Sequence, residues 1–444
     1  MNAAPAILNP DAVETPTEAQ PTSQSTSQPT SQFTAPLVDD SNARPLHRYG
    51  ILLGLLTALG AFGIDTYLPA FPQLAEHFAV DEGRIQLSLT SYFLALALGQ
   101  VFYGPISDRF GRKGPLVVGF LLYSVGSLAC VFAPTVGTLI AFRFVQGIGA
   151  CAGMVIARAI VRDVATGERA AKLFALMILV LGVSPILAPL LGSVLIAVFP
   201  WHSIFWAMGL MGLAAIAMVS FILPETLPID RRSTGGLGLA FVTYGKLMRD
   251  RTFLGTALIG GLSQGAVFAY IAGSPFVFIE LHDVSPTVYS LLFALNASSL
   301  IGAAQFNVKL LRRFGSTRLV RSASIVQTLA ATVLVTLAVM QVETVPTIAV
   351  LLMVILGCHG IIGPTTSLMA IDPWPQNAGS ASALMGSLQF ACGAAASTLV
   401  SLLSNGTTTP MAGSILICAA AALLLGWFTL AREVPARAEV PARA

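Results

Sequence analysis

Two ionisable side chains lie inside long apolar runs of this sequence, where burying a charge is costly. Asp65 stands in the stretch GIDTYLP, and Arg143 stands in the stretch LIAFRFVQG. A buried carboxylate can bind and release a proton as its surroundings change, and a fixed cation nearby influences that exchange. The chemistry that these two residues indicate is therefore proton transfer within a membrane.

Asp65 and Arg143 also match in depth. If one run ends near Pro72 and the other begins near Thr135, each residue lies roughly 10–12 Å below the same surface, at 1.5 Å per residue. We therefore expect them to be neighbours around a cavity. The alternatives are that Asp65 reaches the outer interface and that Arg143 extends its charged head to water along the helix.

The elements that must position these residues are transmembrane helices. Of the 444 residues, 55% are hydrophobic and only 10% are charged, whereas a soluble domain carries about 25% charge. A spanning helix needs about 20 apolar residues, so we expect an all-α integral membrane protein with 12 transmembrane helices in two six-helix bundles. The expected spans are 46–70, 86–106, 114–133, 136–158, 173–198, 203–223, 252–280, 286–308, 319–341, 345–370, 380–404 and 411–431.

Composition divides the chain further. Residues 1–45 are rich in Pro, Thr, Ser and Gln without apolar periodicity, which predicts a disordered tail rather than a signal peptide. Residues 46–223 and 252–431 are the two bundles. A polar linker, 224–251, joins them, and 432–444 form a second tail.

Two patterns relate the halves and orient them. Arg109-Phe-Gly111 follows the second span of the first half, and Arg313-Phe-Gly315 follows the second span of the second half. This echo predicts a duplicated element. In the expected topology, 22 of the 24 Lys and Arg residues fall on one side. The positive-inside rule makes that side cytoplasmic, together with both termini, the linker and the tails.

The fifth span contains two prolines and two glycines that disfavour a straight helix. Gly182, Pro185, Pro189 and Gly192 allow a bend and a close approach between helices. The alternative is a tolerated kink with glycines that serve packing only.

Several polar side chains within the spans could line a substrate cavity. For each residue taken alone, a hydrogen bond between helices is the simpler interpretation, and for the histidine it is a helix contact. The candidates are Tyr67, Gln146, Gln264, Tyr270 and His359.

Other classes of function lack their motifs. The sequence has no GxxxxGK[ST] phosphate loop and no catalytic constellation, so we expect neither ATP use nor an enzyme. The five cysteines are scattered through apolar runs without metal spacing, and we expect no metal or cofactor besides a proton gradient. The net charge of +3 comes from short loops and does not indicate nucleic-acid binding.

The charged stretch GPISDRFGRKGPL at 104–116 resembles the loop 2–3 signature of the major facilitator superfamily, GxLaDRxGRKxxL. The resemblance implies that Asp108 contributes to a charge relay that latches one conformation. Its other members here would be Gly104, Arg109, Gly111, Arg112 and Lys113.

Two further stretches resemble the drug:proton antiporters of that superfamily. The run that begins at Arg143 is similar to the motif whose Arg is associated with proton coupling. The fifth span is similar to the antiporter motif GPxxGG, although Ala188 and Ser193 replace two of its glycines. DTYLPAFP, WHSIFW, PETLP and GSPFVFIE resemble the bicyclomycin-resistance (Bcr/CflA) subfamily more narrowly.

This resemblance implies a monomeric exporter of antibiotics or other small molecules in the bacterial inner membrane. We expect alternating access between the two bundles, with Asp65 as the proton-binding site and Arg143 as its partner in coupling. One embedded acid favours the exchange of a single proton. A nutrient or metabolite symporter or facilitator of the same fold is the main alternative, and a membrane-embedded enzyme or sensor is a third.

Overall fold

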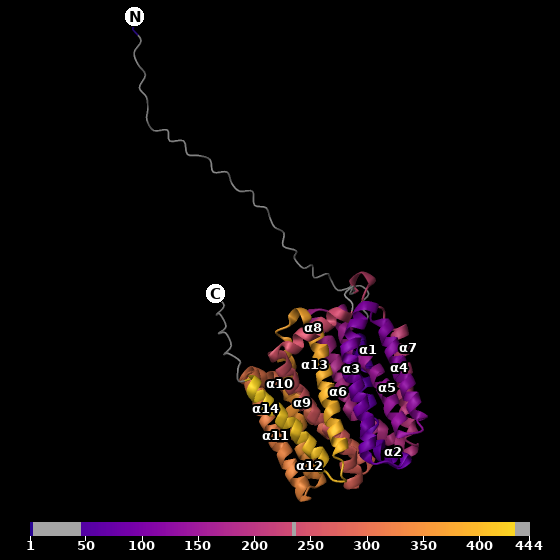
Figure 1. The fold of residues 1–444 in the computed structure, drawn as a ribbon. Coiled ribbons are helices and arrows are strands. Elements are labelled where there is room, and N and C mark those ends of the chain that lie inside the picture. Colours follow the sequence, from indigo (N-terminus) through magenta and orange to yellow (C-terminus); the bar gives the residue numbers. More distant parts are fainter. Residues whose placement is uncertain (3–45, 233–236, 431–444) are drawn as a thin grey trace. The chain divides into compact units, whose positions relative to one another are not determined.

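The computed structural model describes residues 1–2, 46–232 and 237–430, and Figure 1 shows their helical arrangement. Within these ranges, 12 helical segments are long and apolar enough to cross a membrane, which confirms the predicted number. The first half contains α1 (Leu46–Asp65), η2 (Leu68–Ala70), α2 (Phe71–Phe78), α3 (Glu82–Phe110), α4 (Lys113–Val131), α5 (Val136–Val164), α6 (Gly167–Val198) and α7 (His202–Phe221).

The second half repeats this order after a short connecting region. The connection contains η3 (Ile229–Arg231) and α8 (Leu237–Arg249). The second half then contains α9 (Arg251–Pro275), η4 (Phe276–Leu281), α10 (Pro286–Phe314), α11 (Ser316–Met340), α12 (Val345–Ile371), η5 (Pro375–Asn377), α13 (Ala378–Leu402) and α14 (Thr409–Leu430). The two predicted tails fall almost wholly outside the described residues.

The helices α3 and α10 carry the sequence echo between the halves. Each has 29 residues and ends at the Phe of its Arg-Phe-Gly triplet. Each Phe ring lies 5.5 Å from the guanidinium carbon of the Arg before it. The next residue has a positive φ, +90° at Gly111 and +75° at Gly315, a conformation that favours glycine. The echo therefore marks two equivalent helix ends.

The two halves meet along two helix pairs. The helix α3 packs against α13, and α6 packs against α10. We call the end of the bundle that carries the loop between α3 and α4 the basic end, and the other the opposite end. Three side-chain hydrogen bonds join the halves toward the opposite end: Thr90 to Ser397 at 2.8 Å, Ser401 to the Gly83 carbonyl at 2.7 Å and Ser290 to the Pro189 carbonyl at 2.9 Å.

The region between the halves is more ordered than a polar linker. Its helix α8 places Tyr244 and Leu247 in a small apolar cluster with Phe253 and Met385. The Tyr244 hydroxyl donates a hydrogen bond to the Val101 carbonyl at 3.1 Å. The linker helix thus contacts α3 in the first half and α9 and α13 in the second.

The helix α6 keeps both prolines within one continuous helix, Gly167–Val198. Its predicted close approach occurs at Gly192, which lies directly against the Thr66 carbonyl and near the Pro69 ring. Gly182 has only the Ile301 Cδ1 atom near its missing side chain, at 3.8 Å. The close contact is therefore made at Gly192 and not at Gly182.

Candidate functional site

Asp65 is the last residue of α1 and is buried at the boundary between the halves. Its side chain is 5% exposed, and among the described residues its carboxyl makes no hydrogen bond or ion pair. It lies close enough to Tyr92 of α3, Tyr270 of α9 and Tyr289 of α10 to act on them electrostatically. Tyrosines of both halves are thus within electrostatic range of the carboxyl.

Arg143 lies in α5 and is fully buried, with 0% exposure. Its Nη2 atom donates to the Gly63 carbonyl at 2.8 Å, and its Nη1 atom donates to the Gln146 Oε1 atom. The guanidinium carbon lies 4.7 Å from the ring centroid of Tyr67 and 4.3 Å from that of Tyr92. Arg143 therefore does not extend to the surface, and two rings and two oxygens hold its charge.

Asp65 and Arg143 are neighbours without forming an ion pair. Arg143 binds the carbonyl of Gly63, two residues before Asp65. Tyr92 joins Arg143 to the same helix, since its ring faces Arg143 and its hydroxyl donates to the Gly60 carbonyl of α1 at 3.1 Å. The guanidinium thus acts on the backbone that carries Asp65, and a change in either residue can reach the other through α1 and Tyr92.

Two predicted cavity residues belong to this buried network. The Gln146 Nε2 atom donates to the Ser127 hydroxyl at 2.7 Å, which orients the amide toward Arg143. The Tyr67 hydroxyl is hydrogen-bonded to Ser88 at 2.9 Å. Both side chains therefore position the Arg143 charge.

The other three predicted cavity residues are dispersed through the second half. Tyr270 accepts a hydrogen bond from Asn296 at 3.2 Å, and His359 is hydrogen-bonded to Ser263 at 3.0 Å. Gln264 is half-buried. None of the five candidates lines the vestibule described below, so their contact with substrate stays a prediction.

The predicted latch is centred on Arg112, whose side chain is only 6% exposed. Its Nη1 atom lies 2.6 Å from Asp108, and its Nε and Nη2 atoms donate to Asp163 at 2.7 and 3.2 Å. Burial lowers the pKa of the guanidinium, but the hydrogen bonds and charges of Asp163 and Asp108 outweigh it, so the pKa lies above its ordinary value. Arg112 is therefore a fixed cation between two acids.

Glu225 closes the same site from the segment after α7. Its carboxylate accepts hydrogen bonds from the backbone N–H groups of Arg112 at 2.8 Å, Lys113 at 3.2 Å and Leu227 at 3.0 Å. Partial burial raises the pKa of this carboxyl, but these bonds and the nearby Arg232 charge hold it below its ordinary value. Gly111 is required here, because a methyl group at that position would lie 2.6 Å from the Glu225 carboxylate.

Sequence reasoning gave no role to Asp163 or Glu225. Both follow the end of a span on the basic side, which is the signal that could have indicated partners for Arg112. The remaining latch candidates differ in their contacts. Lys113 donates to the Ser220 carbonyl at 2.8 Å, whereas Arg109 is exposed and contacts the Phe110 ring.

A vestibule of about 440 Å³ enters the protein from the basic end. Gln100, Gly104 and Asp108 line it from α3, and Arg158 and Arg162 line it from α5, with residues of α8 and the start of α13 opposite. The Asp108 side chain, 53% exposed, faces this space. The hydrogen bonds between the halves lie toward the opposite end. The structure therefore represents a conformation in which the vestibule is open at the basic end.

No group of three or more His, Cys, Asp or Glu side chains in the described part of the chain is arranged to hold a metal ion. The site consists instead of one buried acid, one buried cation, a latch and a vestibule. Such an arrangement can bind a proton and a small molecule.

The chain is similar to known proteins in sequence and in fold. The model of the Major Facilitator Superfamily matches residues 53–398. The chain is 36% identical to the "Uncharacterized MFS-type transporter YdgK" of Bacillus subtilis, over 86% of this chain and 95% of that protein. It is 30% identical to the "Bicyclomycin resistance protein homolog" of Haemophilus influenzae, over 87% and 97%.

Two further matches extend the comparison. The "Multidrug resistance protein MdtL" of Escherichia coli is 29% identical, over 89% of this chain and 99% of that protein. The crystal structure of a D-xylose-proton symporter has a TM-score of 0.65 at 17% identity, with 88% of this chain and 98% of that one covered. At that identity the structural match shows the fold alone.

Proposed function

Because this chain belongs to the major facilitator superfamily, and is therefore a multi-pass membrane transporter and not an enzyme, we propose that it exports small molecules in exchange for protons. The substrates are antibiotics or other small organic molecules, which is the kind of substrate that the names of two relatives indicate. The proton gradient is the energy source, and Asp65 is the proton-binding site.

The observation that carries this proposal is the burial of Asp65 without a partner. A buried carboxylate with neither a hydrogen bond nor an ion pair is stable only in its neutral form. The halves must separate around Asp65 when the opposite end opens, and water then reaches the carboxyl. The protonation state is thereby linked to which end is open, as antiport requires.

Contacts of α6 support the transmission of movement from Asp65 to the second half. Gly192 lies against the carbonyl of Thr66, the residue after Asp65. One turn earlier, the Pro189 carbonyl accepts the hydrogen bond from Ser290 of α10. Movement at Asp65 therefore displaces the same helix that holds the halves together toward the opposite end.

The cluster of Asp108, Arg112, Asp163 and Glu225 is the latch in this proposal. Its hydrogen bonds tie the loop after α3 to α5 of the first half and to the start of the connecting region after α7. The first half then moves as one body. The exposed carboxylate of Asp108 faces the start of α13 across the vestibule. We propose that the basic end is cytoplasmic, that the membrane is the bacterial inner membrane and that the protein acts as a monomer.

The experiment is proton-driven uptake of a transported drug into inverted membrane vesicles, with Asp65→Asn as the variant. We expect uptake driven by the proton gradient to be lost, while substrate binding to the purified variant persists. Asp283→Asn is the matched control, because Asp283 is an exposed acid at the opposite end whose positive φ of 51° also suits asparagine.

Undiminished coupling in Asp65→Asn would remove Asp65 from the mechanism. Uncoupler-sensitive accumulation of substrate inside intact cells would instead show a symporter and contradict export. Reporter fusions at the two termini test the proposed orientation, and the mass of the purified protein in detergent tests the monomer.

A further inference from the structure

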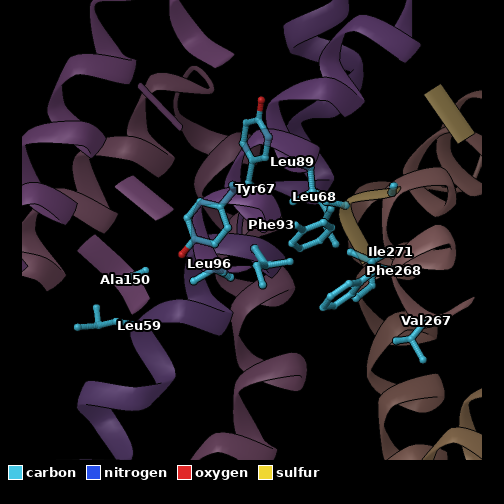
Figure 2. Close-up of a cluster of buried hydrophobic side chains, with 14 of the residues drawn as sticks. Leu59, Tyr67, Leu68, Leu89, Phe93, Leu96, Ala150, Val267, Phe268 and Ile271 are labelled. Carbon is cyan, nitrogen blue, oxygen red and sulfur yellow. The ribbon is translucent and has the colours of Figure 1, made fainter. Parts of the chain in front are cut away.

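Two phenylalanines from opposite halves stack face to face in the middle of the bundle. Phe93 of α3 and Phe268 of α9 have ring centroids 4.2 Å apart and planes that differ by 11°. Phe93 is fully buried and Phe268 is 6% exposed. Figure 2 shows the two side chains extending from their helices within the central apolar cluster.

The second half holds the ring of Phe268 in this place. Phe390 of α13 also stacks on it, at a centroid distance of 5.5 Å and an interplanar angle of 26°. Gly393, one turn further along α13, has no side chain, and a methyl group there would overlap the Phe268 ring. Phe268 is therefore confined between α13 and Phe93, while Phe93 alone comes from the first half.

Phe93 lies on the same helix as a residue of the vestibule, further from the basic end. Gln100, which lines the vestibule, is seven residues after Phe93 on α3, or about 10 Å at 1.5 Å per residue. On the other side, η2 begins three residues after Asp65 and packs against α9. The stack therefore lies between the halves, at a greater depth from the basic end than the vestibule.

We propose that Phe93 and Phe268 form the binding site for a planar aromatic group of the substrate, and that they stack on each other when this site is empty. The inference rests on the proposed function, because it assumes that the halves separate to admit a substrate. A substrate ring inserted between the two phenylalanines replaces one stacked contact by two. Each face of the substrate ring then contacts one phenylalanine ring.

This arrangement selects for shape as well as for apolar character. A flat ring system needs the halves to part by about one ring thickness, roughly 3.5 Å. A globular apolar group needs more and leaves both phenylalanine faces incompletely covered.

The test is equilibrium binding of ethidium and of proflavine, two planar aromatic probes, to the purified full-length protein in detergent without a proton gradient. The variants Phe93→Leu and Phe268→Leu keep apolar volume but remove the ring. We expect each to weaken binding about tenfold, which corresponds to about 1.4 kcal/mol for one lost stacking contact. Phe268→Tyr keeps the ring, so its Kd for each probe should lie within about twofold of the parent's, a difference of about 0.4 kcal/mol.

Phe306→Leu is the matched control, because Phe306 of α10 is 61% exposed on the outside of the helices. Thermal unfolding of every variant verifies that it is folded before binding is compared. Two results would overturn the inference: no saturable binding of either probe to the parent protein, or equal affinities in the parent and both leucine variants.

Binding without a gradient separates this inference from the proposed function. Loss of binding in the leucine variants, with coupling intact in Asp65→Asn, would support the aromatic site and reject the proton site. Unchanged binding in the leucine variants, with coupling lost in Asp65→Asn, would reject the aromatic site and leave the exporter in place.

Discussion

Asp163→Asn should destabilise the protein more than Asp108→Asn, although both acids bind the same guanidinium. The Arg112 and Asp163 side chains are 6% and 15% exposed and share two hydrogen bonds. Asp108 is 53% exposed and makes one bond to Arg112. The two changes therefore compare a buried ion pair with a largely solvated one around one shared cation.

The expected magnitudes follow from that difference in burial. Removing one partner of a buried pair costs about 3–5 kcal/mol, and asparagine retains one of the two acceptor oxygens, so about 2–3 kcal/mol is expected for Asp163→Asn. An exposed pair contributes about 0–1 kcal/mol, because water screens it. The double variant should lose more free energy of unfolding than the two single variants together, because the buried Arg112 guanidinium then has no carboxylate partner.

The measurement is the free energy of unfolding in mild detergent, from denaturant titration of the parent, the two single variants and the double variant. Lys246→Gln, a change in the exposed charge of the linker helix, provides the baseline for a surface substitution. The reasoning fails if Asp163→Asn costs no more than Asp108→Asn, or if the double variant is additive. Either outcome would mean that solvent reaches Arg112 more freely than its burial indicates.

Three further predictions follow from single contacts. Gly192→Ala places a methyl group against the Thr66 carbonyl, so unfolding measurements should show a loss of about 1–3 kcal/mol, whereas Gly413→Ala, in open space, should show none. Arg143→Lys cannot keep both hydrogen bonds and both ring contacts, so proton-driven transport in vesicles should fall about tenfold, the equivalent of one such bond. Because the pKa of Glu225 is lowered, its carboxylate stabilises the folded protein fully above the ordinary pKa of 4.5, and this stabilisation is lost as the pH falls through the lowered value. Glu225→Gln should therefore flatten the dependence of melting temperature on pH below about 4.5.

The spans could be predicted because hydrocarbon makes a local demand. Each segment that crosses a membrane must satisfy its own backbone hydrogen bonds and remain apolar for about 20 residues. Both conditions are visible along the sequence without knowledge of any neighbour. The predicted spans ended at 106 and 308, whereas the helices continue to Phe110 and Phe314, where a glycine with positive φ follows each of them.

The depth of Asp65 and Arg143 was also readable from residue counts, since both lie at a known distance from a span's end. Their relation was not, because it depends on how α1, α3 and α5 are rotated about their axes. Residue counts predicted only that the two residues would be neighbours around a cavity. The packed helices instead place Tyr92 and the Gly63 carbonyl against the guanidinium.

Contacts between distant segments required the tertiary structure. Arg112 meets Asp163 and Glu225 from 51 and 113 residues away, and the sequence contains no pattern that pairs them. The stack of Phe93 on Phe268 joins two helices of different halves, where either ring alone is an ordinary apolar residue of a span. Hydropathy along the chain thus determined how often the membrane is crossed and which loops are basic, whereas helix rotation and packing decided which side chains meet, because those contacts have no local energetic signature.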